Sequence, residues 1–188
     1  MKENTPRIKL YVACSLDGFI ARKDGSIDWL PDAGESSGSE TDYGYSEFYA
    51  SIGTVLMGRK TYEQVLGFGF PWPYGDKKTY VFTRQTGEGG PSIRHEKNVE
   101  FVSGDIGEFV RKLKENTEED IWLVGGSQII RVFLEQGLLQ DLIIFVVPVI
   151  LGGGIPLFER IGKEIGLRLV GTKRYEGGVV RVEYEVVG

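Results

Sequence analysis

The amino-acid sequence predicts an α/β domain with a mostly parallel central sheet, helices on both of its faces, and an antiparallel hairpin at the C-terminal end. Short apolar, β-rich segments alternate along the chain with segments whose apolar residues follow helical spacing, a pattern typical of parallel sheets. The segment Leu142–Ile150 is too apolar for an exposed strand and is expected at the sheet centre. Leu167–Tyr175 and Val179–Val187 flank Glu176-Gly177-Gly178, which predicts the closing hairpin.

The N-terminal part of the chain predicts one buried strand, a long loop and a helix. Ile8–Ser15 is short, apolar and β-rich, and it ends at an Asp-Gly turn. Ala21–Gly44 is mostly polar, and a loop of that length in a compact domain is typical of a functional segment. Tyr45–Ile52 carries apolar or aromatic residues at helical spacing, with Asp42 or Ser46 as the candidate cap.

The middle of the chain predicts a strand, a glycine turn, a helix and two further strands. Thr54–Met57 is a short β-branched and apolar run that Gly58 closes, and Arg59–Leu66 then follows a helical pattern. Lys78–Thr83 and Val99–Val102 are the two further strand candidates, separated by a segment rich in Gly and Pro.

The next segments repeat the order strand, glycine turn, helix. Asp105–Asn116 has helical spacing behind a candidate Asp cap, and Ile121–Val124 reads as a buried strand. Gly125-Gly126 forms a tight turn before the helix Ser127–Gln136. Because ligands of parallel sheets bind at the carboxyl ends of the strands, the two glycine turns are the expected binding positions.

Length and composition indicate one ordinary globular domain that spans residues 1–188. The 188 residues are 41% apolar and 26% charged. The longest apolar run, Leu142–Leu151, is interrupted by Pro148 and is about half as long as the roughly 20 residues of a membrane-spanning helix. Met1–Lys9 is polar and carries no apolar signal-peptide core, so we expect a cytoplasmic protein.

The small number of cysteine and histidine residues argues against metal chemistry. Cys14 and His95 are the single residues of their kinds, so an intrachain disulfide and a zinc site built on cysteines are excluded. We see no spaced acidic loop of the calcium-binding kind and expect no metal. The net charge of −5 argues against general nucleic-acid binding but leaves room for a local basic patch that holds a small anion.

Three strand ends carry groups suited to binding a dinucleotide. Met57-Gly58-Arg59-Lys60-Thr61 joins a strand to a helix N-terminus, where free amides, two cations and a hydroxyl favour a phosphate. Leu123-Val124-Gly125-Gly126-Ser127-Gln128 repeats that geometry, and Thr83-Arg84 adds a hydroxyl and a guanidinium at a third strand end. Each segment alone is also compatible with an ordinary turn carrying solvated charges, but two glycine turns that both precede helices favour a dinucleotide site.

Aromatic residues are concentrated in the middle of the chain. They suit either the stacking of a flat heterocycle or the covering of a dimer surface, and the rigid loop Phe68–Tyr74 either borders the substrate or packs over the sheet edge. The aromatic residues are Tyr43, Tyr45, Phe48, Tyr49, Phe68, Phe70, Trp72 and Tyr74.

Taken together, four motifs resemble the dihydrofolate reductase superfamily, with its three-layer α/β/α fold. A fifth run, Val147–Phe158, resembles the later part of the C-terminal reductase domain of the riboflavin biosynthesis protein RibD, in a stand-alone form. The four motifs are Ala13–Ile20, Ile27–Pro31, Met57–Tyr62 and Leu123–Ile129.

The resemblance implies NADPH as the cofactor. It assigns the 2′-phosphate to Arg59 and the diphosphate to Thr61, so the loss of Arg59 should weaken NADPH binding tenfold or more and erase the preference over NADH. It also implies that backbone groups of Ala13 and Ile20 contact the nicotinamide carboxamide. The remaining cofactor-binding candidates are Gly58, Lys60, Thr83 and Arg84, with Gly125, Gly126, Ser127, Gln128 and Ile129 around the nicotinamide end.

The sequence departs from both relatives at positions that recognise the substrate. By the resemblance, Val146 replaces the threonine that supports the pterin-binding carboxylate in dihydrofolate reductase, and Lys77 replaces the arginine for the folate tail, which disfavours folate. Val124 stands where the riboflavin enzyme usually has an acidic residue. The zinc deaminase often fused to that enzyme is excluded here, because the chain lacks its ligands.

The expected function is an NADPH-dependent reductase that resembles 5-amino-6-(5-phosphoribosylamino)uracil reductase and transfers hydride to a small heterocyclic or sugar-linked substrate. The alternatives are a pterin reductase, a nucleotide-binding module without turnover, and a simple carbohydrate- or peptide-binding domain. By kinship we expect a homodimer. The proton-donor candidates are Asp32 and Asp42, and the substrate-binding candidates are Asp17, Asp28, Trp29 and Glu47.

Overall fold

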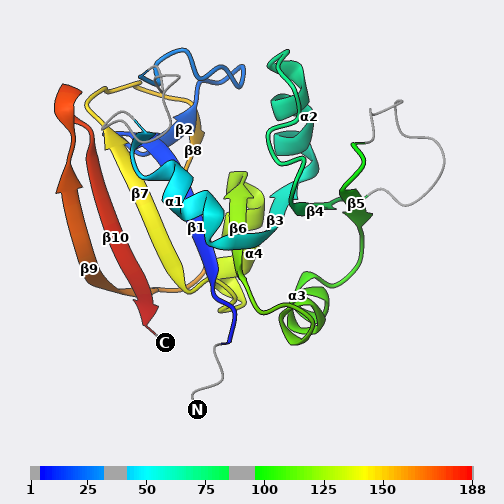
Figure 1. The fold of residues 1–188 in the computed structure, drawn as a ribbon. Coiled ribbons are helices and arrows are strands. Elements are labelled where there is room, and N and C mark those ends of the chain that lie inside the picture. The colour runs from blue at the N-terminus through cyan, green and yellow to red at the C-terminus, as the bar shows by residue number, and fades with distance from the viewer. Residues whose placement is uncertain (1–4, 32–41, 85–95, 188) are drawn as a thin grey trace.

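A computed structural model describes residues 5–31, 42–84 and 96–187 (Figure 1). In these ranges the central sheet has eight strands and a small second sheet has two. The central strands are β1 (Ile8–Ser15), β3 (Ile52–Gly58), β4 (Lys78–Phe82), β5 (Val99–Val102), β6 (Asp120–Gly125), β7 (Asp141–Val147), β9 (Gly166–Arg174) and β10 (Val180–Val187). The small sheet pairs β2 (Phe19–Ala21) with β8 (Ile155–Pro156), and the helices are α1 (Tyr45–Ala50), α2 (Arg59–Gly67), α3 (Ile106–Glu115) and α4 (Ser127–Glu135).

The central sheet is parallel except at its C-terminal hairpin. Its strand order is β5-β4-β3-β6-β1-β7-β10-β9. All neighbours from β5 to β7 are parallel, whereas β10 runs antiparallel to both β7 and β9. The predicted fold class and the closing hairpin are therefore confirmed. Because the parallel strands share one direction, their carboxyl ends meet at one edge of the sheet.

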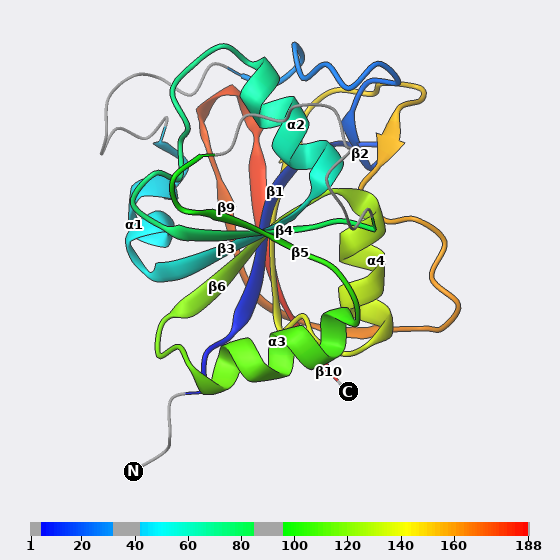
Figure 2. The same ribbon diagram turned by 90° about the vertical axis from the view of Figure 1, so that its right-hand side faces the viewer.

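Two apolar cores lie on opposite faces of the sheet. Successive strand residues point to opposite faces, so Leu10 and Leu123 enter the core covered by α3 and α4, while Tyr11 and Trp122 enter the core covered by α1 and α2. Figure 2 shows α1 and α4 on opposite sides of the sheet. The predicted three-layer arrangement is therefore present.

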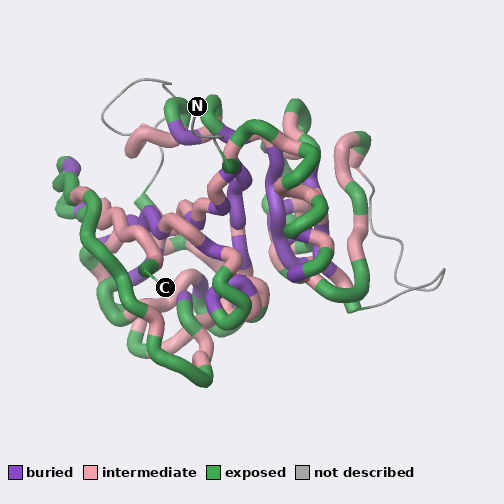
Figure 3. Tube along the Cα trace, turned by 90° about the horizontal axis from the view of Figure 1, so that it is seen from below, coloured by how far each residue is buried: buried purple, intermediate pink, exposed green. Residues whose placement is uncertain are grey.

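Burial falls toward the outer edge of the hairpin. The central strands are largely buried, whereas nearly every residue of β9 is exposed (Figure 3). Leu169 and Val170 on that strand are 57% and 64% exposed. The strand is therefore the least covered part of the sheet.

One of the two predicted helix caps is confirmed. Asp105 caps α3 by accepting a hydrogen bond from the Glu108 amide at 2.7 Å. The N-cap of α1 is Gly44, without a side-chain cap, so neither Asp42 nor Ser46 is the cap residue. Asp42 still accepts from the Ser46 amide at 3.2 Å, in the first turn of α1.

Three features differ from the sequence expectation. The helix predicted to reach Ile52 ends at Ala50, because Ile52 already pairs with β6 as the first residue of β3. The loop predicted from Ala21 is preceded by β2, which pairs with the distant β8. The strand predicted to reach Ile150 ends at Val147, because Pro148 follows and proline has no amide to donate to a sheet.

Along the described part of the chain, we find no helix with the length and apolar character needed to traverse a membrane.

Candidate functional site

The two predicted glycine turns lie against each other at the carboxyl ends of β3 and β6. Met57 and Gly125 are register partners in these neighbouring strands. A Cβ atom at Gly58 would lie 3.0 Å from Ile129 Cγ1 and 3.8 Å from the Gly125 carbonyl oxygen. The turns therefore form one continuous surface.

Glycine keeps this surface open. A Cβ atom on Gly126 would lie 3.2 Å from Thr61 Oγ1, on the neighbouring turn. Gly58 and Gly126 are the N-caps of α2 and α4, and neither helix has a side-chain cap. The first amides of both helices lack intrahelical partners and favour an anion, so this narrow surface fits the diphosphate of a dinucleotide.

Charged and polar side chains border the turns. Arg59 Nε donates to Glu63 Oε1 at 2.8 Å, one helical turn further on, and the Arg59 side chain is 20% exposed. Lys60 is exposed, and Thr61 faces Gly126. The predicted phosphate-binding guanidinium is therefore at the turn, held by a carboxylate that a phosphate must share or displace.

The other predicted coenzyme residues occupy the same edge. Thr83 and Arg84 follow β4, the neighbour of β3, and the Thr83 amide donates to the Val102 carbonyl at 2.9 Å. The buried Ser127 hydroxyl donates to the Pro156 carbonyl and so connects α4 to β8, while Gln128 is exposed. The Ser127 hydroxyl thus has a structural partner, so the predicted ligand contacts of this turn would come from its backbone.

The turn after β1 holds a second loop in place. The Asp17 carboxylate accepts hydrogen bonds from the Leu151 amide at 3.0 Å and the Gly152 amide at 2.8 Å. The Ser15 hydroxyl and these amides lower the pKa of Asp17. Asp17, predicted to bind substrate, is therefore occupied by the backbone of the loop that leads to β8, and Ile20 on β2 packs against the core of α3 and α4.

An aromatic cavity of about 200 Å³ lies on the α1 side of the sheet, beside the end of β1. Most of its lining is apolar, and Asp42 is the acidic residue among the described residues that form it. Its main walls are Tyr11, Ala13, Asp42, Tyr43, Tyr45 and Phe145.

Tyr43 is fixed in an unusual backbone conformation at the cavity wall. Its φ is 54°, in the left-handed region that non-glycine residues rarely adopt. The Tyr43 carbonyl accepts from the Tyr175 hydroxyl at 2.9 Å and from the Tyr11 hydroxyl at 3.3 Å. Its ring contacts Phe145 and Tyr175 edge to face, so three elements hold this wall.

The predicted carboxylates separate into one that reaches the cavity and others that do not. Asp42 lines the cavity. Asp28 is exposed and pairs with Arg22 at 2.6 Å, and Glu47 lies exposed on α1. Asp32 lies outside the described residues, as does His95, so Asp32 stays a prediction.

Trp29 and Cys14 each pack with one of the two apolar cores. Trp29 packs with the α1-side core, and its indole Nε1 is buried without a hydrogen-bond partner among the described residues. Cys14 is buried, and burial raises the pKa of its thiol to about 11. Within the described ranges no group of three or more His, Cys, Asp or Glu side chains is arranged to hold a metal ion.

One residue that the sequence analysis assigned to the substrate site lies on the opposite face of the sheet. Val146, expected in the substrate site, packs against the core of α3 and α4. Phe145 and Val147 face the cavity instead. Both are apolar, so the expected lack of a hydrogen-bonding group at this strand is retained.

The aromatic residues lie in three kinds of surroundings, and the predicted stacking of a heterocycle or covering of a dimer surface stays a prediction. Tyr43 and Tyr45 line the cavity, while Trp72 and Tyr74 pack edge to face over the α1-side core. Phe48 is buried in that core, and the hydroxyl of Tyr49 bonds Asp76. Phe68 and Phe70 stack on each other and are 38% and 53% exposed.

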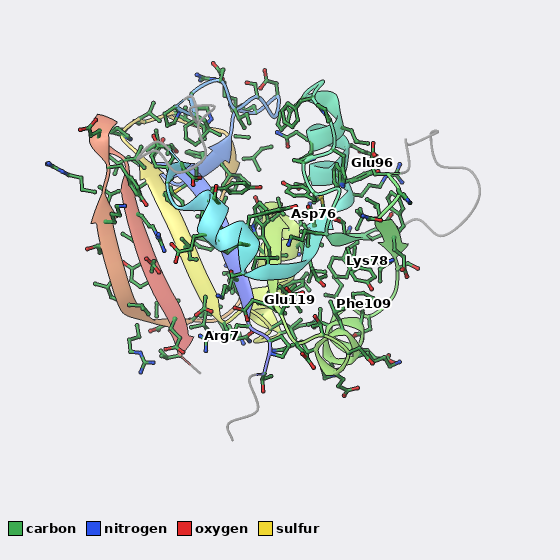
Figure 4. The ribbon with its side chains drawn as sticks, in the orientation of Figure 1. Arg7, Asp76, Lys78, Glu96, Phe109 and Glu119 are labelled. Atoms are coloured by element: carbon green, nitrogen blue, oxygen red, sulfur yellow. The ribbon has the colours of Figure 1, made fainter. Side chains whose placement is uncertain are left out.

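Tyr11 and Phe145 were not predicted as site residues. The usable signal was the alternation along β1, because Tyr11 and Ala13 are two residues apart and face the same side. At the opposite end of β1, Arg7 (Figure 4) pairs with Asp141 at 2.5 Å and with Glu185 at 2.9 Å. The sheet thus carries an ion-pair network at one end and the cavity at the other.

Comparison with known proteins identifies similar chains over nearly the whole length. Residues 72–181 match the protein family described as RibD C-terminal domain. The chain is 43% identical over 175 residues to the uncharacterized protein YwjB of Bacillus subtilis (strain 168), covering 93% of this chain and 95% of YwjB.

Solved structures share the fold. A Shewanella sp. PV-4 protein assigned to riboflavin biosynthesis has a TM-score of 0.84 and 26% identity, over 97% of this chain and 99% of that protein. Dihydrofolate reductase from Enterococcus faecalis, complexed with NADP(H) and RAB-propyl, has a TM-score of 0.67 and 17% identity, over 98% of each chain. The dihydrofolate reductase-like fold is confirmed.

Proposed function

The chain belongs to the RibD C-terminal domain family, and from this membership we propose that it is an NADPH-dependent reductase. The observation that carries the proposal is the continuous surface of the two glycine turns, which lies at the same sheet edge as the aromatic cavity. Strand ends of parallel sheets are where nucleotides bind. A dinucleotide on the turns and a ring in the cavity would thus meet near the end of β1.

We assign coenzyme binding, proton transfer and substrate positioning to different residues. Bound NADPH supplies the hydride, so no nucleophilic side chain is needed. Arg59 and the amides of the two turns would hold its phosphates, and Ala13 lines the cavity at the end of β1. Asp42 lines the cavity, and we assign to its carboxylate the holding or passing of a proton at the substrate. Tyr43 and Phe145 position a flat ring and exclude water around it.

The substrate class follows from kinship. We propose a pyrimidine related to 5-amino-6-(5-phosphoribosylamino)uracil, because the family match and the Shewanella structure both relate to riboflavin biosynthesis. A pterin is the second candidate, since Asp42 faces the cavity as a carboxylate would face a ring amide. A cytoplasmic location and a homodimer remain predictions.

The first experiment measures coenzyme binding. NADPH and NADH are titrated against intrinsic tryptophan fluorescence, and oxidation of NADPH is then followed by absorbance with pyrimidine, pterin and carbonyl substrates. We expect tighter binding of NADPH and turnover with a pyrimidine. Binding without any turnover would favour a nucleotide-binding module, and absence of binding would refute the proposal.

A glycine variant locates the binding site. Gly126→Ala places a methyl group 3.2 Å from Thr61 Oγ1, between the turns, and its φ of −77° tolerates alanine. We expect at least tenfold weaker NADPH binding with little change in stability. Gly67→Ala is the matched control, because a Cβ there has no neighbour within 4 Å. Equal effects of the two substitutions would show that the coenzyme does not lie on the turns.

A further inference from the structure

A row of four side chains runs across the sheet from the cavity to its outer edge. Ala13 on β1 is the register partner of Phe145 on β7. Phe145 is in turn the partner of Arg181 on β10, and Arg181 is the partner of Lys173 on β9. Register partners point to the same face of a sheet. With strands about 4.8 Å apart, Arg181 stands roughly 10 Å and Lys173 roughly 14 Å from Ala13.

The outer half of this row places two cations directly opposite each other. Like charges on facing positions of an antiparallel pair destabilise a sheet. Glu183 balances one of them, with its Oε1 2.8 Å from Arg181 Nη2. The Lys173 ammonium lies 4.7 Å from the centre of the Tyr175 ring. The side chains of Arg181, Lys173 and Glu183 together carry a net positive charge. Such an arrangement is stabilised by an anion that bridges both cations.

Arg181 is held against the wall of the cavity. A Cβ atom on Gly44, the residue between Tyr43 and Tyr45 of the wall, would lie 3.2 Å from Arg181 Nη1. The Arg181 side chain is 24% exposed, and its Nε is buried without a hydrogen-bond partner among the described residues. Although burial disfavours its charge, Tyr175 and Glu183 raise the pKa of Arg181, so the guanidinium stays charged beside the cavity wall.

The cavity itself leaves room for a ring alone. Its volume of about 200 Å³ is below the roughly 300–1,000 Å³ of cavities that enclose drug-sized ligands. A substituent on the bound ring must therefore extend along the sheet surface. From Phe145 that surface continues to Arg181 and Lys173.

We propose that Arg181 and Lys173 bind the phosphate monoester of a substrate whose aromatic ring occupies the cavity. This inference rests on the proposed function for the role of the cavity, and it names the residues that read the charged end of the substrate. The planar guanidinium binds two phosphate oxygens at once, and the lysine adds a flexible point charge.

Uridine and uridine 5′-monophosphate form a probe pair that differs in the phosphate alone. Their affinities for the full-length protein are measured by calorimetry at low ionic strength, with and without NADPH. We expect the monophosphate to bind at least about tenfold more tightly, the effect of one charge-assisted contact. Equal affinities, or no binding of the monophosphate, would overturn the proposal.

Single substitutions then test which side chains bind the phosphate. Lys173→Gln and Arg181→Gln should each bring the affinity for the monophosphate close to that for uridine. Lys173 is exposed, and its replacement removes the contact with the Tyr175 ring. Arg174→Gln is the matched control, since its register partner Val180 places it on the other face. It should keep the phosphate preference, and an equal loss in Arg174→Gln would contradict the site.

NADPH titrations of the same proteins separate the two proposals. A phosphate preference that depends on Lys173, in a protein that does not bind NADPH, would support the anion site and refute the reductase. NADPH binding without any phosphate preference would refute the anion site and leave the reductase standing.

Discussion

Replacing Arg59 with alanine tests the coenzyme site at its most specific contact. The guanidinium stands at the first residue of α2, with a side chain that is 20% exposed and an ion pair of 2.8 Å to Glu63. In the proposed complex it holds the 2′-phosphate, the group by which NADPH differs from NADH. The substitution should therefore weaken NADPH and leave NADH nearly unchanged.

The size of the effect follows from two opposing contacts. A hydrogen bond between charged groups contributes about 1.5–3 kcal/mol. Sharing or releasing the Glu63 pair costs about 0.3–0.5 kcal/mol, as for exposed pairs one helical turn apart. The net is about 1.0–2.7 kcal/mol, roughly a 5- to 100-fold increase in the Kd of NADPH. Glu63→Gln removes the competing contact and should tighten NADPH about twofold.

Tryptophan fluorescence titrations with both coenzymes provide the measurement, and Lys60→Ala is the control for a general loss of positive charge at the turn. Lys60 is exposed, so its removal should weaken both coenzymes only slightly. The reasoning is refuted if Arg59→Ala keeps the NADPH to NADH ratio of the original protein, or if the original protein binds both coenzymes equally.

Three further predictions concern residues around the site. Burial raises the pKa of the Cys14 thiol to about 11, so an aromatic disulfide reagent should label the native protein about a hundredfold more slowly than the urea-unfolded chain, and rapid native labelling would contradict this. The Ser15 hydroxyl and two loop amides lower the pKa of Asp17; its stabilising effect is therefore complete above its unfolded pKa and is lost as the pH falls through the folded value. Asp17→Asn should then lower stability at neutral pH and flatten its decline below about pH 4 in urea titrations, unless these hydrogen bonds are absent. In Gly154→Ala the new methyl group would collide with a β2 carbonyl oxygen, so we expect a loss of about 1–3 kcal/mol in urea unfolding, whereas Gly162→Ala, with open space around it, should be neutral.

The main sheet and its hairpin could be predicted because each strand carries its own local pattern. The small sheet of β2 and β8 could not. Its strands have three and two residues, too short for any periodicity, and they are far apart in the chain. The end of β7 was placed too late because apolar character continues past Pro148, while backbone hydrogen bonding does not.

The two glycine turns and the helices that follow them could be predicted, since glycine and helix starts are local signals. The substrate side depends on strand register, and a shift of one residue exchanges the two faces. Val146 was therefore assigned to the wrong face, and Phe145 was missed. Asp17 was predicted to bind substrate, because the loop amides that it accepts from are more than 130 residues away in the chain. Arg181 and Lys173 could not be connected with the cavity from the sequence, because their positions depend on the register of four strands.

The apolar cores on the two faces of the sheet determine which strands open to solvent most easily. Strands β6, β1 and β7 send alternate side chains into both apolar layers, so their amide hydrogens should exchange with solvent only when the whole fold opens. The outer strand β9 is uncovered on both sides and can detach at lower free energy. The turns proposed for the coenzyme thus sit on the most rigid part of the scaffold, while the proposed phosphate contact sits on its most easily loosened edge.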